Sequence, residues 1–255
     1  MNRLPPAAMA ELVRARGLLA SSHLVIRLTG LLGRAFDMSG GAVLRRLPGS
    51  VRDGLDAVVR RALTTAVSTA LLTVGRDGPL ARITGARWFG AASVAVSGFT
   101  GGAAGLPGTL LELPVTTMLL MRAILEVARA EGEDLSSPEV LLAVLEVFAL
   151  GGPEPVTEGS YFVARIGTTE LLRQAAGQGI AGIMPRAVAT VATRFGVPVA
   201  WKLAGQAIPI AGAAAGAALN VAFLDHFTAR ARGHFIVRRL ERVYGADAVR
   251  TAFAG

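Results

Sequence analysis

The chain has 255 residues, so it is long enough to bury a sizeable core as one large domain or two small ones. Hydrophobic residues make up 52% of it, aromatic residues only 5%, and the mean hydropathy is +0.51, which favours a close-packed helical protein or a membrane-associated one over an ordinary soluble globule. The absence of cysteine from the sequence excludes disulfides and thiolate metal sites.

The net charge of +8 comes entirely from the first third of the chain. Up to Trp88, thirteen arginines stand against five acidic residues, and beyond it the two signs are equal in number. A basic segment of this kind favours an anionic membrane surface or lipid as partner. Nucleic acid is not expected as a partner, because the segment lacks interleaved aromatic residues and any DNA- or RNA-binding motif. Plain solvated helix faces are the alternative, since every basic residue except Lys202 is arginine.

The N-terminus has no continuous apolar stretch before Glu11 and Arg14, which argues against a secretory signal. We therefore expect a cytoplasmic protein, peripheral at the inner face of the cell membrane.

The first fifty residues are predicted as a basic helical extension. Pro5-Pro6 can open a helix that runs toward Leu19, and Gly40-Gly41 breaks the chain again further along. We expect the main helical domain at 51–255. Its first helix, over 51–74, is amphipathic, because apolar residues recur there at i, i+3, i+4 and i+7.

Two glycine- and alanine-rich segments are the clearest packing signal in the chain. The first lies in a charge-free run over 89–111 and the second in an apolar run over 203–224, and each places small residues four apart, so that another helix can approach closely. The packing glycines are Gly98, Gly101, Gly102, Gly105, Gly212 and Gly216. Because both runs are poor in large apolar residues, a buried helical pair is favoured, with interfacial insertion or an inserted transmembrane hairpin as alternatives.

The helices between these segments are delimited by proline, glycine and capping residues. A helix over 113–131 is expected to hold Pro114 in its first turn, and Ser137-Pro138 predicts the capped start of the next helix. Thr157 or Ser160 can open a further helix.

Breaks are expected around Gly177, Gly179 and Gly182, and again at Gly196-Val-Pro198. The last long helix should run from about Ile210 to Tyr244, with Gly245 as its C-terminal cap.

This last helix carries a polar stripe. Asn220, His226, Arg230 and His234 fall within roughly 120° of one another on a helical projection. They would meet the acidic helix that carries Glu112 and Glu126. The functional interpretation is a polar groove that binds a lipid head group or a partner, and the structural one is an ion-pair network between two helices.

Neither a metal nor a cofactor is predicted. His226 and His234 lie eight residues apart, roughly 12 Å along a helix, and cannot share an ion unaided. Asp225 points about 100° away from its neighbour His226 and does not complete a site. The sequence also lacks a phosphate-binding Gly-Lys-Ser/Thr and a Gly-x-Ser-x-Gly nucleophile motif, so no catalytic residue is predicted.

Two blocks of the sequence resemble the EcsC family of bacterial proteins. The first is Gly101-Gly-Ala-Ala-Gly-Leu-Pro-Gly108 with the segment 113–139, and the second is Ile208-Pro-Ile-Ala-Gly-Ala-Ala-Ala-Gly-Ala-Ala-Leu-Asn220 with the segment 221–245. The resemblance implies a hydrophobic protein without an assigned biochemical activity. The family takes its name from a protein encoded beside ABC transporter subunits, which implies an accessory role in transport or secretion.

The resemblance supplies no catalytic residue. It directs attention to the polar positions of the blocks and of the helices between them, which are Arg122, Tyr161, Asn220, Asp225 and His234.

Taken together, the sequence predicts a single all-α, multi-helix domain that is non-enzymatic and associated with a membrane. A lipid-handling protein or enzyme that uses the polar groove is the first alternative. An integral membrane protein is the second.

Overall fold

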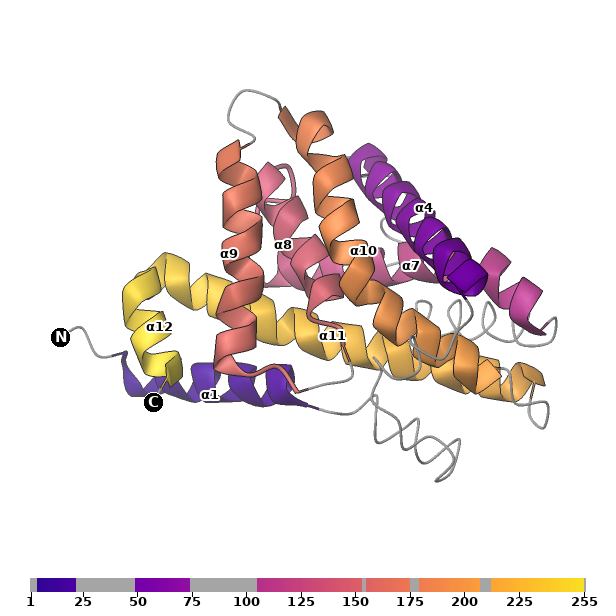
Figure 1. Cartoon of the computed structure of the whole chain (residues 1–255). Helices are drawn as coiled ribbons and strands as arrows, with labels where there is room; N and C mark the ends of the chain where they lie inside the picture. Colours follow the sequence, from indigo (N-terminus) through magenta and orange to yellow (C-terminus); the bar gives the residue numbers. More distant parts are fainter. Residues whose placement is uncertain are drawn as a thin grey trace.

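The computed structural model describes residues 4–21, 49–73, 105–152, 155–174, 179–206 and 212–254, and these residues form helices and short connections without any strand (Figure 1). The prediction of an all-α fold is therefore confirmed. The helices are α1 (Pro6–Ala20), α4 (Gly49–Thr73), α7 (Gly105–Ala130), α8 (Pro138–Ala149), α9 (Glu158–Gln174), α10 (Gly179–Gln206), α11 (Gly212–Tyr244) and α12 (Ala246–Ala254).

Helix α8 is the central element. All nine residues from Val140 to Phe148 are buried, and α7, α9, α10 and α11 pack around them. Ser137 caps the helix as predicted, because its hydroxyl accepts a hydrogen bond from the backbone N–H of Glu139. A helix that is apolar on every side is stable only when it is enclosed, and the buried stretch of α8 fits that rule apart from one charged residue, Glu146.

The larger apolar cluster is built from α4, α7, α8, α10 and α11. At its centre Phe148, Phe195 and Phe227 bring together rings from α8, α10 and α11, with centroids 4.9 to 5.6 Å apart. Helix α4 contributes the apolar stripe predicted for 51–74, since Leu55, Val59 and related positions are buried. That helix is confirmed.

The smaller apolar cluster joins α1, α9, α12 and the C-terminal end of α11. Helix α11 has 33 residues and so a length of roughly 50 Å, which lets it serve both clusters (Figure 1). Its residues from Leu219 to Phe235 belong to the larger cluster and those from Ile236 onward to the smaller one.

Helix α1 lies directly against α11. A Cβ atom at Gly233 would come within 2.8 Å of the carbonyl oxygen of Ala15, so only glycine permits this approach. Leu12, Ala15 and Leu19 are fully buried in the smaller cluster. The predicted first helix is confirmed, and its apolar side forms part of the core.

Two predicted boundaries are wrong. Helix α7 begins at Gly105, before the expected 113, so that Pro107 takes the first turn and Pro114 lies inside the helix. Helix α10 runs through the break expected at Gly196-Val-Pro198, because Phe195 and Val199 are buried in the larger cluster on either side of it. The break expected around Gly177, Gly179 and Gly182 is confirmed, since α9 ends at Gln174 and α10 begins at Gly179, with Gly182 in the first turn of α10.

The C-terminal end of α11 agrees with the sequence. The helix ends at Tyr244, and Gly245 has a φ of 89°, a left-handed conformation that favours glycine. The backbone carbonyl of Gly245 then accepts from the N–H of Val249 at 3.2 Å, which starts the short helix α12. The sequence did not predict α12.

The predicted packing glycines Gly98, Gly101 and Gly102 lie outside the described residues, as does most of the first apolar run. Gly105 begins α7, Gly212 begins α11, and Gly216 lies in the first turns of α11. Among the helical residues that the structure describes, none form a stretch both long and apolar enough to cross a membrane.

Candidate functional site

The polar stripe predicted on α11 lies inside the protein. Asn220, His226, Arg230 and His234 have no exposed surface. Buried polar groups require partners, and the partners of the stripe come from several elements rather than one. The stripe therefore divides into separate contacts along the length of α11.

The first contact joins α11 to α7. Asn220 donates from Nδ2 to Oε1 of Glu112 at 2.8 Å, and the hydroxyl of Thr116 donates to the same carboxylate oxygen. The next hydroxyl along, that of Thr117, donates to the carbonyl of Leu113 at 2.8 Å. Because these side chains are buried, the carboxylate and the amide fix the register of the two helices.

The second contact joins α11 to the end of α8. Nε2 of His226 lies 3.1 Å from the carbonyl oxygen of Gly151, which assigns the ring proton to Nε2 as the donor. The ring of Phe227 lies so close to Gly151 that any side chain there would collide with it. Glycine at this position is required by the close approach of α11.

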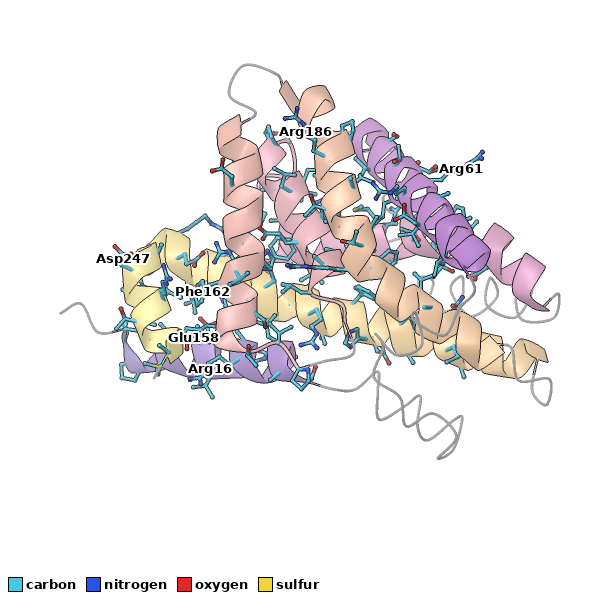
Figure 2. The ribbon with its side chains drawn as sticks, in the orientation of Figure 1. Arg16, Arg61, Glu158, Phe162, Arg186 and Asp247 are labelled. Atoms are coloured by element: carbon cyan, nitrogen blue, oxygen red, sulfur yellow. The ribbon has the colours of Figure 1, made fainter. Side chains whose placement is uncertain are left out.

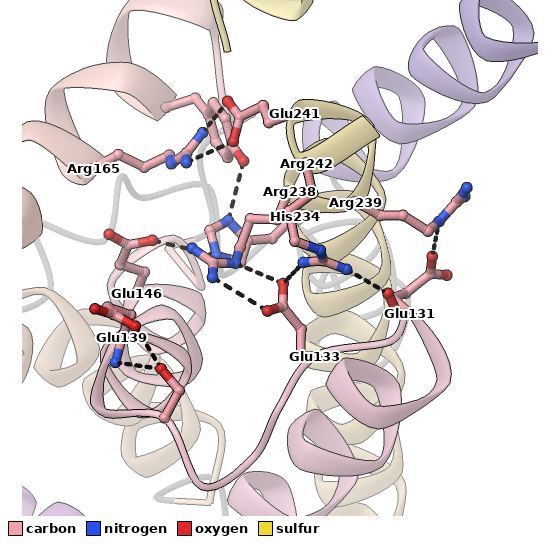
Figure 3. Close-up of polar contacts among 12 residues, drawn as sticks. Glu131, Glu133, Glu139, Glu146, Arg165, His234, Arg238, Arg239, Glu241 and Arg242 are labelled. Atoms are coloured by element: carbon pink, nitrogen blue, oxygen red, sulfur yellow. Dashed lines mark hydrogen bonds and ion pairs between the residues drawn. The ribbon is translucent and has the colours of Figure 1, made fainter. Parts of the chain in front are cut away.

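The third contact links α8, α9 and α11 through His234 (Figure 3). Nδ1 of His234 lies 3.1 Å from Oη of Tyr161, and Nε2 lies 3.3 Å from Oε2 of Glu146. A neutral imidazole fits this arrangement when Tyr161 donates to Nδ1 and the ring proton is on Nε2, which contacts the carboxylate without an aligned hydrogen bond. We assign that tautomer.

Burial controls the protonation of this group. It lowers the pKa of His234 well below the usual histidine value, and the charges of Arg165 and Arg238 act in the same direction. Burial also raises the pKa of Tyr161. Both side chains are thus held in their neutral forms at physiological pH, as a hydrogen-bonded pair within the core.

A bidentate ion pair lies beside this pair. Arg165 donates from Nη1 and Nη2 to the two carboxylate oxygens of Glu241 at 2.6 and 2.8 Å. The same guanidinium stands 5.6 Å from the ring centre of Tyr161. Helices α9 and α11 are therefore held by charge as well as by the His234 contact.

Arg230 lies between the two histidines along α11 and is fully buried. Removal from water disfavours its charged form and lowers its pKa to about 10. It remains protonated at physiological pH.

A group of ion pairs, which we call the ionic seam, holds the loop between α7 and α8 against the C-terminal end of α11 (Figure 3). Glu133 accepts from Arg238 at 2.8 Å and from Arg242 at 2.5 Å, and Glu131 accepts from Arg239 at 2.7 Å. Burial alone would raise the pKa of Glu133, but the hydrogen bonds and charges of its two arginines outweigh it and lower the pKa.

The seam extends to α1. Arg239 also donates to both carboxylate oxygens of Glu11, at 3.0 and 3.3 Å. The arginines at the C-terminal end of α11 are thus engaged with carboxylates.

Three of the predicted site residues, Arg122, Glu126 and Asp225, lie away from the stripe. Glu126 is exposed on α7, where Arg122 pairs with it at 3.6 Å from one turn away. Burial of part of the Glu126 side chain raises the pKa of its carboxyl group. Asp225 is exposed on α11. It is Glu112, rather than Glu126, that meets the stripe.

Sequence reasoning missed Glu146, Thr116 and Gly151 as partners. Glu146 had a usable signal, since it is the one charged residue in the apolar run 140–148. Its pairing with His234 had none, because many positions separate the two residues along the chain.

The contacts of the stripe are hydrogen bonds and ion pairs that connect neighbouring helices. Among the described residues, no group of three histidine, aspartate or glutamate side chains is suited to bind a metal ion. Whether the stripe also binds a ligand stays a prediction.

Comparison with protein families gives a match. The family model described as the EcsC protein family matches residues 89–240, which is more than half of the chain. No curated protein and no solved structure shows a significant match to the chain.

Proposed function

We propose that this chain, which belongs to the EcsC protein family, is a non-enzymatic protein that binds the anionic, cytoplasmic face of a membrane. The surplus of positive charge supports the proposal, because all of it precedes the matched region, whereas the residues beyond Trp88 carry no net charge. Near an anionic lipid surface each basic residue contributes about 1 kcal/mol.

One observation carries the proposal. Arg61 of α4 is exposed and, within the described part of the chain, makes no ion pair, whereas the arginines at the end of α11 are held by carboxylates. Its neighbour Arg60 is held by Asp56 at 2.6 Å. Arg61 of the basic third is thus available to an external anion, while the arginines at the end of α11 are engaged internally.

The alternative of an enzyme or lipid-handling groove is less well supported. Its four stripe residues have no exposed surface, and the hydrogen bonds of Asn220, His226 and His234 are made to α7, to the carbonyl of Gly151 just after α8, and to α9. The accessory role beside an ABC transporter, which the family resemblance implies, and the inserted hairpin stay predictions.

Flotation with vesicles tests the proposal. We expect the protein to float with vesicles that contain phosphatidylglycerol at low salt, to be released as the Debye length shrinks toward about 3 Å near 1 M salt, and to ignore vesicles of phosphatidylcholine alone. Failure to float with the anionic vesicles at low salt would overturn the proposal. Equal flotation with neutral vesicles would overturn its electrostatic basis.

A further inference from the structure

We infer that the outer face of α1 is the surface that enters the membrane interface, with its apolar side chains at the boundary between head groups and acyl chains and its flanking arginines on lipid phosphates. The inference rests on the proposed function and adds to it the site of contact. The outer face of α1 consists of six exposed residues, Pro6, Met9, Ala10, Val13, Gly17 and Ala20.

This face is apolar, although it is the exposed side of a surface helix. At 100° per residue its six members fall within about 100° of one another, and none of them has a polar side chain. The opposite side of α1 is apolar as well, because Leu12, Ala15 and Leu19 are buried in the smaller cluster. A helix that is apolar all round is normally enclosed on every side, so a further partner is expected on the outer face.

Two large apolar side chains lie on the outer face one turn apart. Met9 is 37% exposed and Val13 is 57% exposed. The other exposed large apolar residues in the described part of the chain lie on three different helices and are Val115, Val163 and Val243. Single exposed valines are ordinary on a protein surface, whereas two neighbouring large residues on an apolar face indicate a contact site.

Arginines border the face on both sides. Arg14 lies about 40° beyond one edge and Arg16 about 20° beyond the other. Neither makes an ion pair with any residue that the structure describes. The guanidinium of Arg16 stands 5.6 Å from the ring centre of Phe253 on α12, a contact that orients the side chain and leaves its charge in place. The acidic residue of α1, Glu11, lies on the opposite side and is bound by Arg239 at 3.0 Å.

Helix α1 presents this face in a fixed orientation. It runs along the lower edge of the described helices in Figure 1, beneath α11, and Figure 2 shows Arg16 on it. The close approach of Gly233 to the carbonyl of Ala15 holds the helix against α11. Because the face is formed before binding, little further ordering is needed when it meets a membrane.

The pattern of the face fits a membrane interface. An apolar strip flanked by arginines is typical of helices that lie in the plane of the interface, where the apolar side chains are buried at the head-group boundary. Guanidinium groups at the edges can bind phosphate oxygens through paired N–H donors. The surrounding sequence has the matching charge, since residues 1–50 contain seven arginines and two acidic residues.

A second copy of the chain fits the face less well than a membrane does. Helix α1 has 15 residues and a length of about 22 Å, so a strip about 10 Å wide covers roughly 220 Å², well below the roughly 800 Å² that each partner contributes to a standard protein interface. Each edge carries an arginine, so two copies packed face to face would bring like charges together. We therefore commit to a lipid surface and make self-association an outcome of the test.

Two double variants of unchanged net charge provide the test. Met9→Gln with Val13→Gln removes the large apolar side chains from the outer face of α1. The control, Val163→Gln with Val243→Gln, removes valines that are 60% and 63% exposed on α9 and α11. Because the control positions have the greater exposed fractions, a general loss of surface hydrophobicity would affect the control at least as strongly.

We expect the α1 variant to lose about tenfold in partition onto vesicles that contain phosphatidylglycerol, since less apolar area leaves water on binding, and the control to change by less than about twofold. Thermal unfolding followed by circular dichroism should give similar Tm values for the two variants, because all four side chains are exposed.

The outcomes separate the inference from the proposed function. Equal losses in the two variants would overturn the inference and leave membrane binding intact. Absence of flotation by the unmodified protein would overturn the proposed function as well. Self-association of the unmodified protein in solution that the α1 variant alone abolishes would assign the face to a second copy in place of the lipid.

A second measurement keeps the rest of the face intact. Because the sequence has no cysteine, a single introduced cysteine can be labelled uniquely. With an environment-sensitive fluorophore at Val13→Cys or at Val163→Cys, vesicles that contain phosphatidylglycerol should shift the emission at residue 13 to shorter wavelength and leave that at residue 163 unchanged. An equal shift at both positions, a shift at 163 alone, or no shift at either while the protein floats would overturn the inference.

Discussion

The hydroxyl of Tyr161 and Nδ1 of His234 lie 3.1 Å apart although 73 positions separate them in the sequence. Their contact lies where the two apolar clusters meet, since Tyr161 belongs to the smaller cluster and Phe235, next to His234, to the larger one. Glu146 approaches the other ring nitrogen from α8. One imidazole thus joins three helices at the boundary between two cores.

Tyr161→Phe should lower the free energy of unfolding by about 1 to 3 kcal/mol, because Nδ1 of His234 loses its donor in a buried place. Denaturant unfolding measures the change. The chain has one other tyrosine, Tyr244, which is half-buried, and Tyr244→Phe is the control, with an expected change within about 0.5 kcal/mol. Equal effects of the two substitutions would contradict the role given to the hydroxyl.

His234 should make stability depend on pH. Its pKa in the folded protein lies below the usual value of 6.5, so the unfolded chain binds the proton more readily and stability falls as the pH drops below 6.5. The loss should reach about 1.4 kcal/mol at pH 5.5.

The variant His234→Gln cannot take up this proton. Between pH 7.5 and 5.5 its free energy of unfolding should therefore fall by about 1.4 kcal/mol less than that of the unmodified protein. The groups that face the imidazole, Tyr161, Glu146, Arg165 and Arg238, stay the same in both proteins. Parallel pH profiles for the two proteins would refute the lowered pKa.

Asn220→Asp should destabilise the protein by about 3 kcal/mol or more, because it places a second carboxylate beside Glu112 in a buried contact. Adding Glu112→Gln restores one amide and one carboxylate with their positions exchanged, so the double variant should recover part of the loss. Thermal or denaturant unfolding of the three variants forms the cycle. If the double variant is as unstable as the sum of both single changes, the two side chains are not coupled.

Gly233→Ala should loosen α1 from α11, since the added methyl group meets the carbonyl of Ala15 and the side chain of Leu19. Hydrogen exchange of the α1 amides should then accelerate more than exchange in α8. Gly17→Ala is the control within α1 itself, because nothing lies within 4 Å of a Cβ there, and it should raise helix stability by about 0.5 to 1 kcal/mol. Unchanged protection of α1 in Gly233→Ala would mean that the contact tolerates a methyl group.

Local patterns allowed much of the helical layout to be predicted. The stripe of α4, the Ser137 cap of α8 and the glycine that ends α11 are all encoded within a few neighbouring residues. The continuity of α10 through Pro198 could not be predicted in this way, because it depends on burial of Phe195 and Val199 against other helices. Packing there outweighs a local signal for a break.

The polar contacts likewise include one that the local sequence could indicate and others that it could not. The approach of α11 to Glu112 was one of the arrangements that the stripe allowed, because helical periodicity places Asn220 on that side. The pairing of His234 with Tyr161 and Glu146 depends on how α8 and α9 pack, for which no single segment carries a signal.

The packing of α1 on α11 sets an order of events during synthesis. Leu12 and Leu19 leave the ribosome first, but the helix surface around Gly233 that covers them is made roughly 210 residues later. At about 5 to 20 residues per second, the first helix of the chain waits for roughly 10 to 40 seconds before its partner exists. During that interval the apolar side of α1 is exposed and can contact chaperones or a membrane. The smaller apolar cluster is completed only when α11 packs against α1.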